Sequence, residues 1–94
     1  MIRSFRSKAT ECVFGGERTP ELPAEIQSVA LRKLQQLSIA RSLADLKVPP
    51  GNRLERLRGD RAGQHSIRIN DKCRICFVWR GTDAADVEIV DYHD

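Results

Sequence analysis

Three side chains of different chemistry stand next to one another near the C-terminal end of this sequence: Asp91, Tyr92 and His93. Together they offer a hydrogen-bond acceptor, a flat aromatic face and an imidazole that titrates near neutral pH. They follow residues 86–90, where apolar and polar residues alternate as in a β-strand. This spacing favours a site for proton transfer or for stacking at the end of a strand.

Arginine is the second source of candidate chemistry. The chain carries 16 Lys and Arg residues, of which 12 are Arg, and its formal net charge is +3. The planar guanidinium binds phosphate through paired donors and stacks on nucleic-acid bases, which the ammonium of Lys does less well. The composition therefore favours a polyanionic partner, although a solvated Arg-rich surface accounts for it about as well.

Size and composition limit the class of protein. A chain of 94 residues, 40% hydrophobic and 31% charged, is typical of one globular domain, which we expect to span residues 1–94. The longest apolar run covers residues 75–79, too short to cross a membrane. The basic N-terminus is followed by no hydrophobic signal region. An odd number of cysteines, three, suits a reducing compartment, so we expect a cytoplasmic protein.

Cys73 and Cys76 form a C-x-x-C pair, which raises the possibility of a metal or redox site. They lie in a strand-like segment, however, where residues three apart point to opposite faces. The other thiol and imidazole side chains, on Cys12, His65 and His93, are scattered along the sequence. We therefore expect buried strand cysteines and predict neither a metal site nor a cofactor.

The first half of the chain predicts helices. Residues 8–14 are expected to form a short helix that stops at Gly15 and Gly16, after a brief opening strand over residues 1–5. Apolar residues recur at helical spacing over residues 24–41, which predicts an amphipathic helix, and residues 42–52 read as a loop. His65 and Trp79 are expected to have structural roles.

The second half predicts strands over residues 53–59, 64–70, 72–80 and 87–93, separated by short polar turns. Helices followed by an antiparallel meander indicate an α+β fold: two N-terminal helices packed on one face of a small, mainly antiparallel twisted sheet. The other face would carry Arg68 and Arg74, because the apolar residues of their strands alternate with them. Candidate phosphate contacts near that face are Arg53, Arg56, Arg58, Arg61 and Arg68.

Three pieces of this pattern occur together in one known family. They are L-x-x-L-x-G-D-R-x-G-Q over residues 54–64, the hairpin RINDKCRICF over residues 68–77, and the D-Y-H end. In this order and spacing the chain resembles the RelE/ParE toxin superfamily, and the HigB-type toxins most of all. The resemblance implies a RelE-like fold and a ribosome-dependent endoribonuclease that cuts mRNA in the decoding site. It also implies a helix-turn-helix antitoxin, HigA-like, with operator DNA bound only through the toxin–antitoxin complex and no membrane partner.

Metal-free RNA cleavage needs a base for the 2′-OH, an acid for the leaving 5′-oxygen and a cation for the crowded phosphorane. Glu55 is the candidate base, His93 the candidate acid and Arg74 the candidate phosphate clamp. Tyr92 is a candidate for stacking on a base or holding the scissile nucleotide. Asp91 either orients His93 or simply helps to close the strand.

The candidate base departs from the pattern of the resembling family. HigB-type toxins often carry His at the position of Glu55, whereas the related YoeB-type toxins use a Glu, an Arg and a C-terminal His. Glu55, Arg74 and His93 match that YoeB-type set. Cross-strand ion pairing with the surrounding arginines is an alternative explanation for Glu55.

Two other classes of protein remain open. One is a non-catalytic toxin of the ParE type, which inhibits DNA gyrase and has no use for a Glu, Arg and Tyr-His set. The other is a simple basic module that binds nucleic acid in a salt-dependent way and leaves it intact. Cleavage of RNA separates the endoribonuclease from both.

Overall fold

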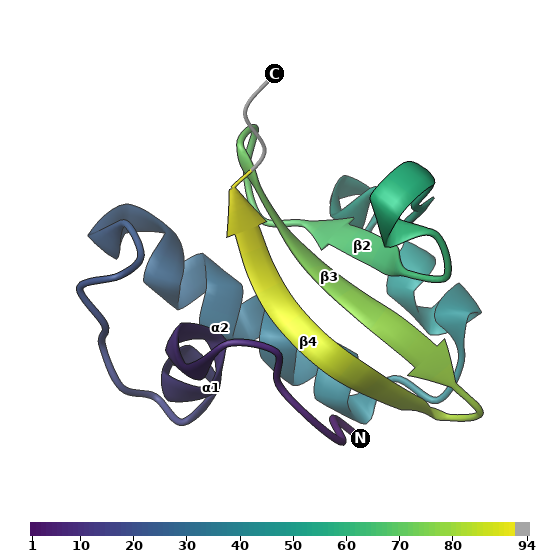
Figure 1. The fold of residues 1–94 in the computed structure, drawn as a ribbon, viewed down its shortest axis with the longest axis horizontal. Helices are drawn as coiled ribbons and strands as arrows, with labels where there is room; N and C mark the ends of the chain where they lie inside the picture. Colours follow the sequence, from purple (N-terminus) through teal and green to yellow (C-terminus); the bar gives the residue numbers. More distant parts are fainter. Residues whose placement is uncertain (92–94) are drawn as a thin grey trace.

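The chain folds as two helices followed by a four-stranded antiparallel sheet (Figure 1). The structure, a computed structural model, describes residues 1–91. Neighbouring strands in the sheet are also neighbours in sequence, in the order β1-β2-β3-β4, which confirms the predicted α+β meander. The elements are α1 (Lys8–Phe14), α2 (Ala24–Ile39), β1 (Glu55–Arg56), β2 (His65–Arg68), β3 (Cys73–Arg80) and β4 (Asp83–Asp91).

Both helices begin and end close to where the sequence predicts. The Ser7 side chain accepts a hydrogen bond from the backbone N–H of Thr10 at 3.2 Å and so caps α1. That helix stops at Gly15, and Gly16 follows with φ 83°, a conformation that glycine adopts without strain. The long helix, α2, ends two residues before the predicted position because Ala40 has extended backbone angles.

The core lies between α2 and one face of the sheet. Ile67, Ile75 and Ile89 lie directly opposite one another on β2, β3 and β4, and all three belong to the buried core cluster. Leu34 and Leu37 of α2, fully buried, belong to the same cluster. Since burying one large aliphatic side chain contributes about 1.5–3 kcal/mol, this apolar layer fixes which face of the sheet is left for polar residues.

The N-terminal segment lines the outer edge of β4. Ile2 and Phe5 form isolated parallel bridges with Ala84 and Val87, in place of the predicted opening strand. Between them, Ser4 accepts a hydrogen bond from the backbone of Val87 at 3.0 Å. These contacts pair the first residues of the chain with its last strand and cover a sheet edge.

The segment between α2 and β2 differs most from the sequence prediction. The expected strand over residues 53–59 is reduced to Glu55–Arg56, because the chain turns into a 3₁₀ helix, η3 (Gly59–Arg61), with Gly59 at φ 65°. The expected loop over residues 42–52 contains two further 3₁₀ helices, η1 (Leu43–Lys47) and η2 (Pro50–Asn52).

The last hairpin is longer than predicted. β4 begins at Asp83 instead of residue 87, because its first residues pair with the end of β3. A register shift between Cys76 and Val78 admits the extra residues, and Asp86 takes up the irregularity with φ 51°. The Ser4 hydroxyl accepts a hydrogen bond from the Asp86 backbone N–H at 2.8 Å and holds this bulge.

One buried hydroxyl ties α1 to the sheet and allows a test of this arrangement. The Thr10 Oγ1 accepts a hydrogen bond from the backbone N–H of Ile89 at 2.9 Å. Thr10→Val keeps the shape of the side chain but leaves that amide unpaired, so we expect the free energy of unfolding to fall by about 1–3 kcal/mol in urea titrations. Thr10→Ser should restore most of it. An unchanged midpoint for Thr10→Val would show that the hydrogen bond contributes nothing.

Candidate functional site

The polar face of the sheet holds the candidate site. Glu55, Ser66, Cys76 and Glu88 lie directly opposite one another across β1 to β4, on the face that the isoleucine row leaves free. Arg68, Arg74 and Val90 form the next row on the same face. An open groove of about 270 Å³ runs over these rows and is lined by Arg53, Glu55, Arg68, Asn70, Asp71 and Arg74.

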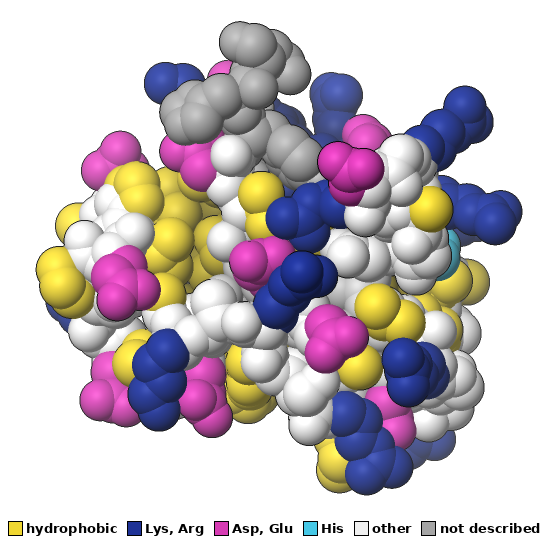
Figure 2. Space-filling view, viewed as in Figure 1, with side chains coloured by type: hydrophobic (Ala, Val, Ile, Leu, Met, Phe, Trp, Pro, Cys, Tyr) yellow, Lys and Arg dark blue, Asp and Glu magenta, His cyan; other side chains and the backbone are white. Residues whose placement is uncertain are grey.

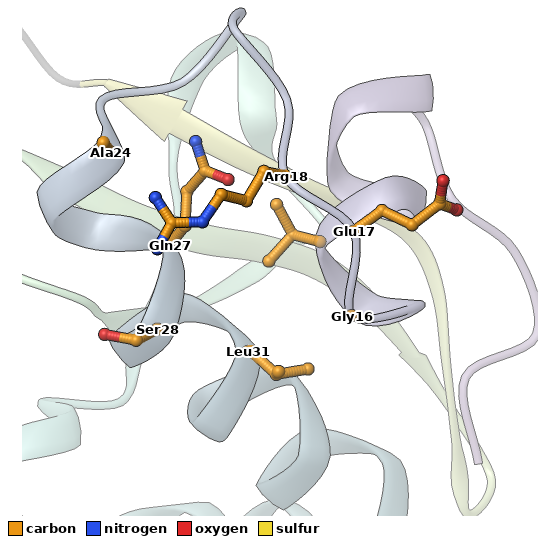
Figure 3. A pocket seen from close by; sticks show the side chains of 8 residues that line it. Gly16, Glu17, Arg18, Ala24, Gln27, Ser28 and Leu31 are labelled. Atoms are coloured by element: carbon orange, nitrogen blue, oxygen red, sulfur yellow. The ribbon is translucent and has the colours of Figure 1, made fainter.

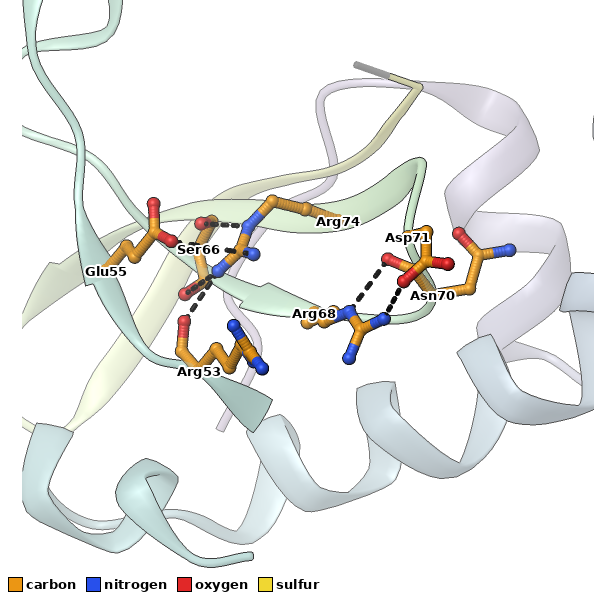
Figure 4. Close-up of polar contacts among 7 residues, drawn as sticks. All are labelled: Arg53, Glu55, Ser66, Arg68, Asn70, Asp71 and Arg74. Atoms are coloured by element: carbon orange, nitrogen blue, oxygen red, sulfur yellow. Dashed lines mark hydrogen bonds and ion pairs between the residues drawn. The ribbon is translucent and has the colours of Figure 1, made fainter. Parts of the chain in front are cut away.

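Arg74 is the fixed cation of this groove (Figure 4). Its Nε donates to the Ser66 hydroxyl at 2.7 Å, and its Nη2 donates to the Arg53 carbonyl at 2.6 Å and to the Ser66 carbonyl at 3.5 Å. The side chain is only 13% exposed. A guanidinium held by three acceptors loses little freedom when it binds an anion, so the arginine is positioned in advance for phosphate.

The carbonyl that Arg74 uses comes from an unusual backbone position. Arg53 follows η2 with φ 45° and ψ 57°, in the left-handed region that non-glycine residues rarely adopt. Such a conformation costs about 1–3 kcal/mol and persists only where surrounding contacts enforce it. Here the contacts with Arg74 and the 3₁₀ turn before it hold the backbone in place.

Glu55 faces Nη1, the third nitrogen of the Arg74 guanidinium. Its Oε1 lies 3.7 Å from Nη1 of Arg74, and its side chain is 58% exposed. Among residues 1–91, Nη1 is the nitrogen of Arg74 left without a hydrogen bond, so it can donate to an incoming anion. A phosphate oxygen bound there would bring the neighbouring hydroxyl within reach of a carboxylate base.

Two of the five arginines predicted to bind phosphate line the groove. The Arg53 side chain is exposed at its margin. Arg68 lies on the floor and donates to the Asn70 carbonyl at 3.1 Å and to the Asp71 carboxylate (Figure 4). Because Asp71 is 91% exposed, this ion pair is weak and can yield to a stronger anion.

The other three predicted arginines lie elsewhere. Arg61 donates to the Glu88 carboxylate at 3.3 Å and to the Gln64 side chain at 3.0 Å, so it spans from η3 to β4. Arg56 lies opposite His65 in the register of β1 and β2, so its side chain points to the other face of the sheet from Glu55. Arg58 is exposed just before η3. In the view of Figure 2, Lys and Arg side chains stand out along the upper right margin, where Figure 1 places β2 and its preceding turn.

The candidate residues at the C-terminal end are placed only in part. Asp91 is exposed and lies opposite Cys73 in the sheet register. It therefore shares the alternation of Ile89, away from the face that carries Arg74. Tyr92 and His93 lie outside the described residues, so their roles remain predictions.

Sequence reasoning did not identify two polar residues of this face. Ser66 is completely buried and fixes Arg74 through both its hydroxyl and its carbonyl. Glu88 holds Arg61 across the sheet. Alternation along the strands could have identified both. Ser66 precedes the buried Ile67, and Glu88 lies between the buried Val87 and Ile89, so both must face the opposite side of the sheet.

The cysteines and His65 are placed as structural residues. Cys73 packs in the core and Cys76 lies on the other face; burial, followed by the charge of Asp91, raises the pKa of the Cys73 thiol. His65 stacks on Phe77 with ring centroids 6.2 Å apart, and burial, followed by the charge of Arg56, lowers its pKa. In residues 1–91, no group of three or more His, Cys, Asp or Glu side chains is placed to hold a metal ion.

A second hollow, of about 190 Å³, lies between α2 and the segment that follows α1 (Figure 3). Its buried polar residue is Gln27, whose amide bonds the backbone N–H of Thr19 at 3.2 Å and the carbonyls of Thr19 and Leu22 at 2.8 and 2.9 Å. Because these contacts occupy the amide, Gln27 anchors the segment and the Glu55–Arg74 groove is the stronger candidate site.

The fold agrees with the comparisons to known proteins. A family model described as the RelE-like toxin of the type II toxin-antitoxin system HigB matches residues 3–93. The chain is 38% identical to Toxin HigB-1 of Vibrio cholerae over 80 residues, 84% of each protein. It is 31% identical to Endoribonuclease HigB of Proteus vulgaris over 93 residues, 99% of this chain and 100% of that protein.

The chain therefore belongs to the HigB-like toxin family of type II toxin–antitoxin systems, and it has an antitoxin as partner. Two structures of the YoeB-YefM complex from Staphylococcus aureus share its fold, with TM-scores of 0.54 and 0.51 at 17% identity. Each alignment covers 100% of this chain and 99% of the other. No helix within residues 1–91 has the length and apolar character needed to span a membrane.

The contacts of Arg74 predict different stabilities for two variants. Glu55→Gln removes only an exposed partner 3.7 Å away, so we expect the free energy of unfolding to change by less than about 0.5 kcal/mol. Ser66→Ala removes the buried acceptor of Nε and should lower it by about 1–3 kcal/mol. Urea unfolding of both variants measures the difference. A larger loss for Glu55→Gln would favour the ion-pairing explanation of that residue.

Proposed function

We propose that this toxin is a metal-independent endoribonuclease that cuts mRNA in the ribosomal A site and so inhibits translation. The observation that carries the proposal is the guanidinium of Arg74, held by Ser66 and Arg53 with Nη1 directed toward Glu55 in an open groove. The name of the Proteus vulgaris relative, an endoribonuclease, supports the same chemistry.

The cleavage step uses the RNA's own nucleophile. Glu55 takes the proton of the 2′-OH, the 2′-oxygen forms a bond to phosphorus, and the bond from phosphorus to the 5′-oxygen breaks. His93 gives a proton to that leaving oxygen, while Arg74 stabilises the negative charge of the phosphorane. The products are a 2′,3′-cyclic phosphate and a 5′-hydroxyl. Tyr92 holds the scissile nucleotide, and Asp91 orients His93 from the end of β4.

The partners follow from the family. The antitoxin is a HigA-like helix-turn-helix protein, and operator DNA is bound through the toxin–antitoxin complex. The ribosome presents the mRNA to the basic face, which places the activity in the cytoplasm. That two solved relatives are toxin–antitoxin complexes supports the assignment of an antitoxin partner.

Primer extension on a translated mRNA, with and without ribosomes, tests the proposal. We expect new RNA 5′ ends only with ribosomes, and losses of about 10²–10⁴-fold in rate for His93→Ala and for Glu55→Gln, each of which removes one proton-transfer group. Arg18→Ala, on the far segment after α1, is the matched surface control and should cut at the wild-type rate.

Three outcomes would contradict particular parts of the proposal. If His93→Ala cleaved at the wild-type rate, the assignment of His93 as the acid would be wrong. If free RNA were cleaved as fast as RNA on ribosomes, the requirement for ribosomes would be wrong. Intact mRNA under all conditions would remove the endoribonuclease itself, and inhibition of DNA gyrase would be measured next.

Salt provides an independent test of the basic groove. If arginines contact phosphates, the affinity for the ribosome falls steeply with salt concentration. Arg53→Ala, at the margin of the groove, should lower the slope of log affinity against log salt by about one. Sedimentation binding at several salt concentrations measures the slope, and an affinity independent of salt would exclude the groove as a phosphate contact.

A further inference from the structure

A buried amine lies on the helical side of the molecule, far in sequence from the groove. Lys33, in the middle of α2, is 8% exposed, and its Nζ donates a hydrogen bond to the side-chain carbonyl of Asn52. Among residues 1–91, no carboxylate lies within ion-pair distance of this amine. Burial, and then the charge of Arg32, lowers the pKa of Lys33. Burying an amine that has no carboxylate partner costs free energy, so the position calls for a role.

Asn52 uses its whole amide to hold the connector against α2. It is completely buried, and its Nδ2 donates to the carbonyls of Leu46 and Val48 at 3.2 and 3.4 Å and to the Gln36 side chain at 3.4 Å. With the Lys33 contact on its oxygen, the side chain joins α2 to both ends of the segment over residues 46–52. These four side-chain contacts are more than are needed to form the short helix η2.

The residue after Asn52 leads directly to the groove. The backbone N–H groups of Asn52 and Arg53 bond the carbonyls of Pro49 and Pro50 at 2.9 and 3.1 Å, which closes η2. Arg53 then turns into the left-handed conformation and presents its carbonyl to Nη2 of Arg74. The position of that carbonyl, and therefore of the guanidinium, depends on where Asn52 is held.

We propose that Lys33 and Asn52 are positioning residues for Arg74, acting from the opposite side of the sheet through the Arg53 carbonyl. The proposal rests on the proposed function, since it assigns to Arg74 the clamping of the reacting phosphate. Lys33 holds the oxygen of Asn52, Asn52 holds η2, and η2 sets the acceptor that leaves Nη1 of Arg74 facing Glu55. A displacement of about 1 Å at a reacting group can reduce a rate by about 10²-fold, so this support matters for the chemical step.

The test compares two buried amides that each anchor a connector to α2. Asn52→Ala releases the segment leading to Arg53, whereas Gln27→Ala releases the segment over residues 15–23, which contributes no residue to the lining of the groove. Both variants should lose stability, so single-turnover cleavage is measured at a temperature where circular dichroism shows both to be folded. We expect Asn52→Ala to lower the maximal rate by about 10–100-fold with an unchanged half-saturating ribosome concentration, and Gln27→Ala to keep the wild-type rate. Equal rates for the two variants would overturn the proposal.

Lys33 supplies a milder pair of variants in case Asn52→Ala does not fold. Lys33→Met keeps the length of the stem and removes the donor, whereas Lys33→Arg retains a charged donor. The proposal requires a lower maximal rate for Lys33→Met and at least partial recovery for Lys33→Arg. Equal rates for Lys33→Met and the wild type would contradict it.

A readout that needs no RNA separates this inference from the proposed function. The Nε–H of Arg74, bonded to Ser66, gives a nuclear magnetic resonance signal that Arg74→Lys assigns by its loss. Asn52→Ala and Lys33→Met should shift this signal and speed its exchange with water, whereas Gln27→Ala should not. An unchanged signal in Asn52→Ala would overturn the inference. Absence of cleavage by the wild type would count against the proposed function alone.

Discussion

The contact between the Arg53 carbonyl and the Arg74 guanidinium joins the two halves of this toxin. One partner is fixed by the connector that leaves α2, and the other projects from β3 in the middle of the sheet. A guanidinium that is 13% exposed needs acceptors in fixed positions, because an unpaired buried charge is costly. The groove can therefore exist only when helix, connector and sheet have all reached their final places.

The elements that sequence predicted well are those whose pattern is local. Leu34 and Leu37 follow the period of a helix, and Ile67 and Ile75 follow the period of a strand, so their burial could be predicted without knowing their partners. The backbone of Arg53 could not be predicted in this way. Its left-handed backbone angles depend on Asn52 and on a guanidinium 21 residues away. Neither contact produces a periodic pattern in the sequence.

The candidate site shows the same limit for charge. Counting arginines predicted a basic surface, and Arg53 and Arg68 do line the groove. Counting could not distinguish them from Arg61. The guanidinium of Arg61 is bonded to the carboxylate of Glu88, which lies on β4, 27 residues further along the chain. The carboxylate paired with Arg68 is 91% exposed and yields readily to another anion, whereas that of Glu88 is 23% exposed and holds Arg61 more firmly. The sheet decides which arginine receives the better-buried partner. Glu55 and Arg74 came together as predicted because they lie on neighbouring positions of one face.

The N-terminal segment along β4 has a consequence for the order in which the protein is made. Ile2 and Phe5 pair with Ala84 and Val87, so the beginning of this sequence waits for partners that are translated some 80 residues later. Until residues 83–91 have been translated and have left the ribosome, the strand that carries Arg74 lacks its β4 partner. The sheet beneath the groove is therefore completed only after the helices and the other strands have been made.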